Sequence, residues 1–295
     1  MTRQIFQLAA MVLLCLPTPA CAQKSEEGRP DGKALPVGAE LNICNDCPVF
    51  VRVPDSPKGM RPIRFVAKFE LTWNNYLAAY NAGRCAIPNP HTAISSKGPN
   101  DLLADVKSLY IDWPASKLGP VEVRCYIGWL QEKTPYIVRL PDSKEWEWFA
   151  RVGRANAKFP WGDDPDPNKE ALCGNARVEK LRIPPAAMGV SRGHMHGVAP
   201  GQFPPNDWGL YDIMGSLYEL TSVTISGEEW YRQNPDSKFA EQTRNEVRTV
   251  VKGGSIYFCD WSENGISGQS TVYTVDDHYS FDVAIRLVLI EKYGM

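Results

Sequence analysis

The spacing of apolar residues predicts three helices in the first half of the chain. The first begins after Thr72, a residue type suited to cap a helix, and its apolar stripe consists of Trp73, Tyr76, Leu77 and Tyr80. They stand at positions i, i+3, i+4 and i+7, so they share one face of a helix. That face is expected to pack against the core.

The other two predicted helices follow within seventy residues. The second spans about Val121 to Lys133, with an apolar face at helical spacing. The third starts at Asp142, and Glu145 lies three residues further on, which is an acidic version of the capping box.

Short strands are predicted on either side of these helices. Cys47–Pro54 alternates in the manner of a strand, and Ile63–Phe69 is a second candidate. Near the other end, Arg248–Lys252 and Val283–Ile290 are expected to be strands. From Phe159 onward, Gly, Pro, Asn and Trp interrupt the pattern, so long ordered loops over a small sheet are expected there.

The composition is that of a globular protein; the length allows one large domain or two small ones, and no break in composition marks a second. Of 295 residues, 43% are hydrophobic and 22% are charged, and the formal net charge is -2. No basic run stands out, so nucleic acid is not expected as a partner. The polar stretch 23–43 is expected to be a flexible lead-in, and residues 44–295 are expected to form the domain.

The first 22 residues have the pattern of a secretion signal. Arg3 precedes the apolar stretch Leu8–Leu16, which is too short for a good transmembrane span. Residues 20–22 (Ala-Cys-Ala) fit a cleavage site, so cleavage after Ala22 and a secreted or periplasmic location are expected. Lipoprotein processing at Cys21 is the alternative. No segment of the mature chain is expected to span a membrane.

Export changes the interpretation of the cysteines. Cleavage would leave six of them, an even number that predicts disulfides in an oxidising compartment. The sequence does not select among their possible pairings. Cys44 and Cys47 are expected to form a structural bridge; a redox motif is the alternative, although no βαβ pattern surrounds the pair. The six are Cys44, Cys47, Cys85, Cys125, Cys173 and Cys259.

Several short motifs occur in an order that resembles one family. They are Phe69–Tyr76 (FELTWNNY), Pro120–Val123 (PVEV), Trp129-Leu130, Arg139–Glu147 (RLPDSKEWE), Phe159–Gly162 (FPWG), Asn206–Gly215 (NDWGLYDIMG), Lys252–Ser255 (KGGS) and Ile285–Val288 (IRLV). The ordered set is similar to that of the formylglycine-generating enzyme, or sulfatase-modifying factor, family. The resemblance covers nearly the whole mature chain.

The resemblance implies a single α+β domain of the C-type-lectin-like kind, with few helices, short strands and long irregular loops. The same superfamily includes ergothioneine-forming nonheme iron enzymes and a periplasmic protein of pyoverdine maturation. The fold therefore does not determine the reaction.

The resemblance also implies an active site in which two nearby cysteines bind copper(I) and oxidise a substrate cysteine with O2. Cys259 falls near the place of the first cysteine, but Asn264 occupies the second place and no cysteine follows Cys259. One thiolate cannot form that copper site, so formylglycine-generating activity is not expected. Cys259 and Ser255 remain candidate catalytic residues, and Gly254 and Trp261 candidate substrate-groove residues. The alternative for Cys259 is a disulfide partner or a buried apolar side chain.

A structural calcium ion is the second implication of the resemblance. Asp212 and Glu219 would supply carboxylates, and Gly215 and Leu217 would supply backbone carbonyls, which suits a cation that prefers oxygen ligands. The alternative is that Asp212 caps a turn and that Glu219 is solvated.

Two further metal sites rest on fewer ligands. A second calcium site of the family would use Asn175 and the carbonyl of Ala176, but Gly193 stands near the place of its usual aspartate. His194 and His196 form a His-x-His pair that could ligate copper or iron, although no third ligand is identified. Histidines in a surface loop are the alternative.

These observations leave two hypotheses for the function. The chain is either an exported oxidoreductase of the formylglycine-generating or pyoverdine-maturation type, acting on a peptide or peptide-derived substrate, or a non-catalytic module that binds a ligand or a protein. A redox metal, copper or iron, would discriminate between them.

Overall fold

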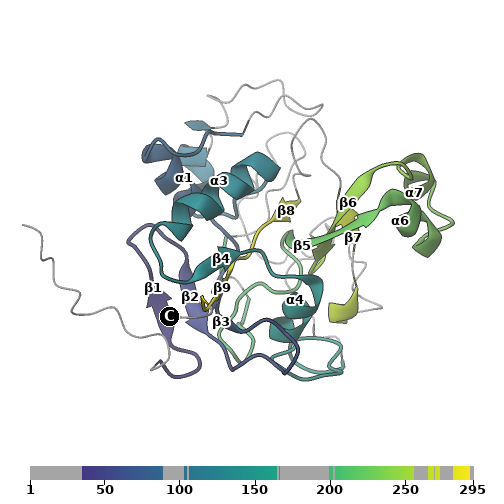
Figure 1. The fold of residues 1–295 in the computed structure, drawn as a ribbon, viewed down its shortest axis with the longest axis horizontal. Coiled ribbons are helices and arrows are strands. Elements are labelled where there is room, and N and C mark those ends of the chain that lie inside the picture. The colour runs from purple at the N-terminus through teal and green to yellow at the C-terminus, as the bar shows by residue number, and fades with distance from the viewer. Residues whose placement is uncertain are drawn as a thin grey trace, which may run out of the picture. The chain divides into compact units, whose positions relative to one another are not determined.

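The computed structural model describes residues 35–88, 103–104, 106–164, 166, 199–201, 203–255, 265–268, 270–272 and 282–292. Residues Pro36–Met295 cluster as one compact unit, and Met1–Leu35 form a separate one. The description below concerns the first of these units (Figure 1).

Nine short strands form two sheets in the described part of this unit. The first sheet has the order β1-β2-β3-β9-β4, and all of its pairs are antiparallel. Its strands are β1 (Glu40–Asn42), β2 (Val49–Arg52), β3 (Ile63–Ala67), β9 (Val288–Ile290) and β4 (Ile137–Arg139).

The second sheet has the order β7-β6-β5-β8. Its strands are β7 (Ser270–Val272), β6 (Val247–Lys252), β5 (Tyr218–Ser226) and β8 (Val283–Ala284). The pair β5–β8 is parallel, and the other two pairs are antiparallel. Short strands in two sheets, joined by long loops, confirm the predicted α+β class.

The helices are α1 (Trp73–Asn81), α3 (Pro120–Gln131), α4 (Ser143–Ala150), α6 (Gly227–Gln233) and α7 (Lys238–Gln242). A π-helical turn (Val106–Tyr110) and a 3-10 turn (Gly265–Ser267) complete the helical elements. Among the described residues, none of these helices is long and apolar enough to cross a membrane.

Local capping explains where two of these helices begin. The Thr72 side chain accepts a hydrogen bond from the Asn75 amide, and the Asp142 side chain accepts one from the Glu145 amide. The Glu145 carboxylate in turn accepts from the Asp142 amide at 2.7 Å, which completes the box. Both predicted starts are confirmed.

Two disulfides lie in the described part of the chain. Cys44 and Cys47 are bonded to each other, a pairing that the sequence alone did not select. Cys85 and Cys125 are also bonded, and this bridge joins the end of α1 to α3. Each bridge restricts the unfolded chain and so stabilises the folded one.

The main core lies between the first sheet and α4. Val51, Val66 and Val288 from the sheet pack with Trp146 and Phe149 of α4, and all five side chains are buried. Leucine and methionine side chains from the loop at 210–214 close the same cluster. The segment before β5 is thereby held against the core.

The predicted strand Val283–Ile290 is divided in the structure. Its first part, β8, joins the second sheet, and its last part, β9, joins the first (Figure 1). The backbone between them bonds to the segment around β3: the Ile285 carbonyl accepts from Leu71, and the Leu287 carbonyl accepts from Ala67. The chain therefore passes from one sheet to the other at Arg286.

Some elements differ from the sequence-based expectation for reasons of tertiary pairing. Strand β1 falls within the expected lead-in 23–43, because Glu40–Asn42 pairs in register with Val49–Val51 of β2. Strands β4, β5 and β7 and helices α6 and α7 were not predicted either. Their own sequences carry weak periodicity, and partners distant in the sequence stabilise them.

Arg286 occupies the crossing point between the sheets. Its guanidinium donates to the carbonyls of Ala67 and Lys68, each at 3.0 Å, and of Tyr211 at 2.8 Å. It also forms an ion pair with Glu219 at 2.6 Å, and both side chains are buried. One side chain therefore joins β3, the loop before β5 and β5 itself.

We predict that Arg286→Met destabilises the protein strongly, because it leaves the Glu219 carboxylate buried without its cation. Removal of one partner of a buried ion pair costs about 3–5 kcal/mol. Urea unfolding followed by intrinsic fluorescence measures the effect. The control is Arg84→Met, which breaks an exposed ion pair with Glu132 and should leave the unfolding midpoint nearly unchanged. Equal effects of the two substitutions would contradict the prediction.

Helices α6 and α7 sit at the far end of the β5–β6 hairpin (Figure 1). Gly227 starts α6, and a Cβ atom at this position would overlap the backbone carbonyl of Thr243. The Gly227 amide also donates to the Glu246 carbonyl at 2.7 Å, so the two ends of the helical tip are in close contact here. This close approach requires glycine.

We predict that Gly227→Ala opens the tip of this hairpin. The clash is with backbone, so residues 226–247 must shift, at a cost of about 1–3 kcal/mol. Hydrogen exchange should become faster within that segment and stay unchanged in α3. Gly128→Ala is the matched control, because Gly128 lies in α3 with open space around it. If hydrogen exchange within residues 226–247 is as slow in Gly227→Ala as in Gly128→Ala and the wild type, the close-contact explanation is wrong.

Candidate functional site

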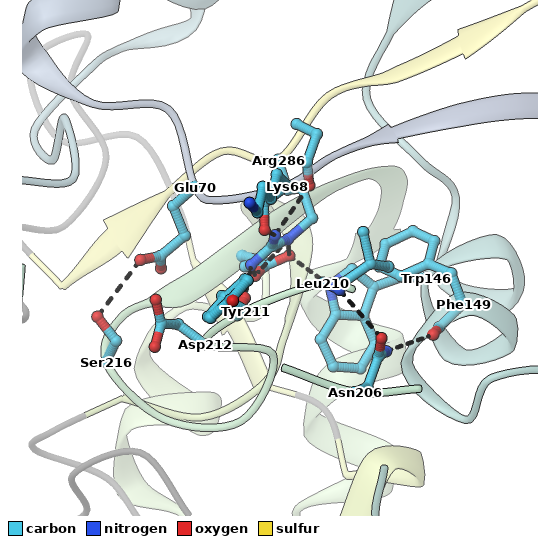
Figure 2. Close-up of polar contacts among 12 residues, drawn as sticks. Lys68, Glu70, Trp146, Phe149, Asn206, Leu210, Tyr211, Asp212, Ser216 and Arg286 are labelled. Carbon is cyan, nitrogen blue, oxygen red and sulfur yellow. Dashed lines mark hydrogen bonds and ion pairs between the residues drawn. The ribbon is translucent and has the colours of Figure 1, made fainter. Parts of the chain in front are cut away.

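Three carboxylates and one guanidinium gather in the interior beside the loop that precedes β5 (Figure 2). Glu70 follows β3, Asp212 lies in the loop, Glu219 lies in β5, and Arg286 lies between the sheets. Their residue exposures are between 0% and 4%. The predicted pair Asp212 and Glu219 is therefore brought into one buried cluster.

Glu219 is fully engaged within this cluster. Arg286 Nη2 donates to Oε1 at 2.6 Å, and Arg286 Nε lies 2.9 and 3.0 Å from the two oxygens. Trp146 Nε1 donates to Oε2 at 2.7 Å. Burial opposes the charge on Arg286, but the Glu219 carboxylate outweighs this effect and raises the pKa of the guanidinium. Glu219 is therefore buried and paired, so the alternative that its side chain is solvated is wrong.

Asp212 is held by the backbone of its own loop and of a neighbouring segment. It adopts a left-handed conformation with φ +54°, and its Oδ2 accepts from the Gly201 amide at 2.7 Å. Its Oδ1 is buried and has no hydrogen-bond partner. Burial raises the pKa of Asp212 to about 6, although the amides of Gly201 and Phe203 act in the opposite direction.

Glu70 is the third carboxylate, and it lies opposite the same loop. Ser216, another left-handed residue with φ +60°, is 3.3 Å from Glu70 Oε2 through its hydroxyl. Glu70 Oε1 is buried without a partner. Burial, followed by the nearby charge of Glu219, raises the pKa of Glu70 well above its ordinary value, and Asp212 adds to this effect.

The calcium ligands implied by the resemblance fit this geometry in part. Asp212 offers a buried oxygen without a partner, which suits a cation. Glu219 offers none, because both of its oxygens already accept hydrogen bonds from Arg286 and Trp146. Within the described ranges, no group of three or more His, Cys, Asp or Glu side chains is arranged to hold a metal ion. The four-ligand set that includes Glu219 therefore does not fit as expected, and calcium remains a prediction.

The candidate catalytic residue Ser255 lies in a turn after β6. Gly253 and Gly254 both have positive φ, and Gly253 packs closely against the Trp146 ring and the Ile213 carbonyl. Ser255 is fully buried, and its hydroxyl is 3.1 Å from Asp282 Oδ2. In this arrangement the hydroxyl joins two segments of the chain rather than facing solvent.

Several predicted site residues lie outside the described residues. They are Cys259 and Trp261 of the candidate active site, Asn175 and Ala176 of the second calcium site, and the His194 and His196 pair. Their roles remain predictions.

A pocket of about 190 Å³ lies beside the buried cluster. Its lining includes Trp161, Phe203, Pro204, Pro205 and, at one side, Asp212. The Trp161 ring is stacked on Phe159, and its indole nitrogen donates to the Asp164 carbonyl, so the wall of the pocket is held in place. Asn206 and Asp207 also line it, so the pocket combines polar groups with aromatic and proline surfaces, which suits part of a peptide.

Neither Glu70 nor Arg286 is among the residues predicted as site residues from sequence, although each lies in a family motif. Both are charged residues between apolar neighbours, in Phe69-Glu70-Leu71 and Ile285-Arg286-Leu287. A charge in the middle of an apolar run signals a buried, paired group. That signal identifies them as interior residues but does not say which groups they contact.

Known proteins resemble this chain in part of its length. Formylglycine-generating enzyme from Mus musculus is 36% identical over 126 residues, covering 41% of this chain and 30% of that enzyme. Inactive C-alpha-formylglycine-generating enzyme 2 from Bos taurus is 32% identical over 114 residues, covering 38% of this chain and 33% of that protein. The chain thus spans about a third of the length of these relatives.

Comparison of folds and of family patterns extends the likeness to most of the chain. The structure of PvdO from Pseudomonas aeruginosa superimposes with a TM-score of 0.55 at 20% identity, covering 87% of this chain and 100% of that one. At this identity the likeness shows a shared fold. The model of the sulfatase-modifying factor enzyme 1-like domain matches residues 66–287, well over half of the 295 residues. The chain therefore belongs to the family of sulfatase-modifying factor enzyme 1-like domains.

Proposed function

We propose that this chain is an exported binding module of its family, which holds a peptide or peptide-derived ligand, or a protein partner, without copper–thiolate oxidation. The observation that carries the proposal is the absence of any cysteine after Cys259, where the family pattern requires a second one. A two-coordinate copper(I) site needs two thiolates. The bovine relative named as inactive is a precedent for this fold without the activity.

The surroundings of Ser255 support the same conclusion. A hydroxyl that acts on a substrate has to reach it, and Ser255 is buried against Asp282. The pocket lined by Trp161, Phe203, the neighbouring prolines and the polar residues Asn206 and Asp207 is the place we propose for a peptide-like group. Binding there requires none of the residues of the candidate active site.

Export is supported by two independent features. The leader-like pattern of residues 1–22 predicts secretion. The bonds Cys44–Cys47 and Cys85–Cys125 are of the kind that persists in oxidising compartments. We therefore propose a secreted or periplasmic location.

An oxidoreductase of the pyoverdine-maturation type is the second candidate. It is favoured by the retained Gly-Gly-Ser turn at Gly253–Ser255 and by the shared fold with PvdO. Such an enzyme would require a redox metal or another oxidant. His194 and His196, with Cys259, are the residues we would assign to a metal of this kind.

Elemental analysis of protein purified from an oxidising compartment tests the two candidates. A binding module is expected to contain less than about one tenth of a copper or iron ion per chain, because it lacks the thiolate pair. One copper or iron per chain would overturn the binding-module proposal and establish the second candidate. In that case Cys259→Ser and His196→Ala should lose the metal, whereas the double variant Cys44→Ser/Cys47→Ser, which removes a disulfide outside the candidate site, should keep it.

A further inference from the structure

The pocket beside the buried cluster is lined partly by exposed and partly by buried residues, so it leads from the surface into the interior. Its exposed lining residues are Pro204, Pro205 and Asp207, and its buried ones include Leu210, Asp212 and Met214. Its volume of about 190 Å³ is more than ten times the roughly 15 Å³ that one water molecule needs. The pocket therefore has room for a short side chain of a ligand.

The polar side chains of the pocket offer acceptors to a ligand rather than donors. Trp161 Nε1 and Asn206 Nδ2 are the two side-chain donors in its lining, and each already donates to a backbone carbonyl, at 2.9 and 3.1 Å respectively. Asn206 Oδ1 accepts from two amides of its own turn. The remaining polar side chains are the carboxylates of Asp207 and Asp212, and no lysine, arginine or histidine of the described chain lines the pocket.

The two carboxylates differ in whether a cation already accompanies them. Asp207 is exposed and forms an ion pair with Arg154. Asp212 is 4% exposed; its Oδ2 accepts from the Gly201 amide, and its Oδ1 has no hydrogen-bond partner among the described residues. The Arg286 guanidinium lies nearby, but its hydrogen bonds go to another carboxylate and to backbone carbonyls. A buried acceptor without a donor is rare in folded proteins, so Asp212 Oδ1 needs a partner from elsewhere.

We propose that the pocket accepts a lysine side chain of a bound peptide, with the ammonium group at Asp212 and the aliphatic stem against Leu210 and Met214. A primary ammonium supplies both the hydrogen-bond donor and the positive charge that this carboxylate lacks. The methylene groups of the stem bury apolar surface against the two apolar side chains. The Trp161 ring, which also lines the pocket, adds an attraction for the cation.

The geometry favours lysine over arginine. A guanidinium binds a carboxylate best through two parallel hydrogen bonds, one to each oxygen. Asp212 has a single oxygen without a partner, because the Gly201 amide occupies Oδ2. An ammonium group is a compact charge that needs only one of the two oxygens.

This inference rests on the proposed function, since it names the feature of the peptide that the binding module would hold. The two proposals can fail separately. One copper or iron ion per chain would overturn the binding module without emptying the pocket of its acceptor. A pocket that does not distinguish lysine would leave the metal content unchanged.

The experiment compares three small probes by NMR titration of the full chain in the presence of a chelator. The probes are the Nα-acetyl methylamides of lysine, norleucine and arginine, and norleucine has the four-carbon stem of lysine without the ammonium group. The lysine probe should bind with a Kd on the order of 1 mM, as expected for a ligand of its size. The other two should bind about tenfold more weakly, because they lack the single charge-assisted contact.

Each probe can contradict the proposal. A lysine probe that does not bind, or a norleucine probe that binds equally well, would overturn it. An arginine probe that binds as tightly as the lysine probe would overturn the assignment of the site to an ammonium group.

The variant Asp212→Asn tests the acceptor itself. Asparagine tolerates the left-handed backbone of this position and keeps an oxygen for the Gly201 amide, so the variant should fold. It should bind the lysine probe about tenfold more weakly and the norleucine probe as the wild type does. Asp236→Asn is the matched control, because Asp236 is an exposed carboxylate outside the pocket, and it should bind lysine normally. Unchanged lysine binding in Asp212→Asn would overturn the proposal, and if this variant does not fold, the three probes on the wild type decide it.

Discussion

The ion pair between Arg286 and Glu219 is the constraint on which much of this fold depends. Arg286 lies where the chain passes from β8 to β9, and Glu219 lies in β5 beside β8. The guanidinium also binds backbone carbonyls next to β3 and in the loop before β5. A buried arginine needs all of these acceptors, so one side chain determines how two sheets and an irregular loop meet.

The same ion pair explains why the rest of the cluster is electrostatically unusual. Arg286 is hydrogen-bonded to Glu219, and although its charge also acts to lower the pKa values of Glu70 and Asp212, burial outweighs this effect at both residues. Asp212 lies in the loop before β5, and Glu70 lies opposite this loop. Asp212 and Ser216 both adopt left-handed backbone conformations there. Burial therefore raises the pKa values of Glu70 and Asp212, and the charge of Glu219 from this structural ion pair acts in the same direction.

Local features of the sequence predict the parts of the fold that local interactions determine. The capping residues Thr72 and Asp142 start α1 and α4 as expected, because each satisfies amides within its own turn. The segment Val283–Ile290 has the periodicity of one strand, yet its halves pair with different sheets. No local feature of this segment distinguishes one continuous strand from two short strands in different sheets. The partners of Glu70 and Arg286 lie up to 219 positions away, so the sequence identified the residues of the motifs but not their contacts.

The family motifs in this chain separate into those that maintain the fold and those that perform chemistry. Gly253 packs against Trp146, Trp146 donates to Glu219, and Glu219 pairs with Arg286. Gly253, Trp146 and Arg286 come from three different motifs, Glu219 lies in β5 outside them, and each residue supports the next through a physical contact. They are retained here together with the fold, whereas the second cysteine of the copper pair is absent. A core of this kind places no demand on the chemistry of the loops, so the same scaffold is compatible with different chemistry at the site.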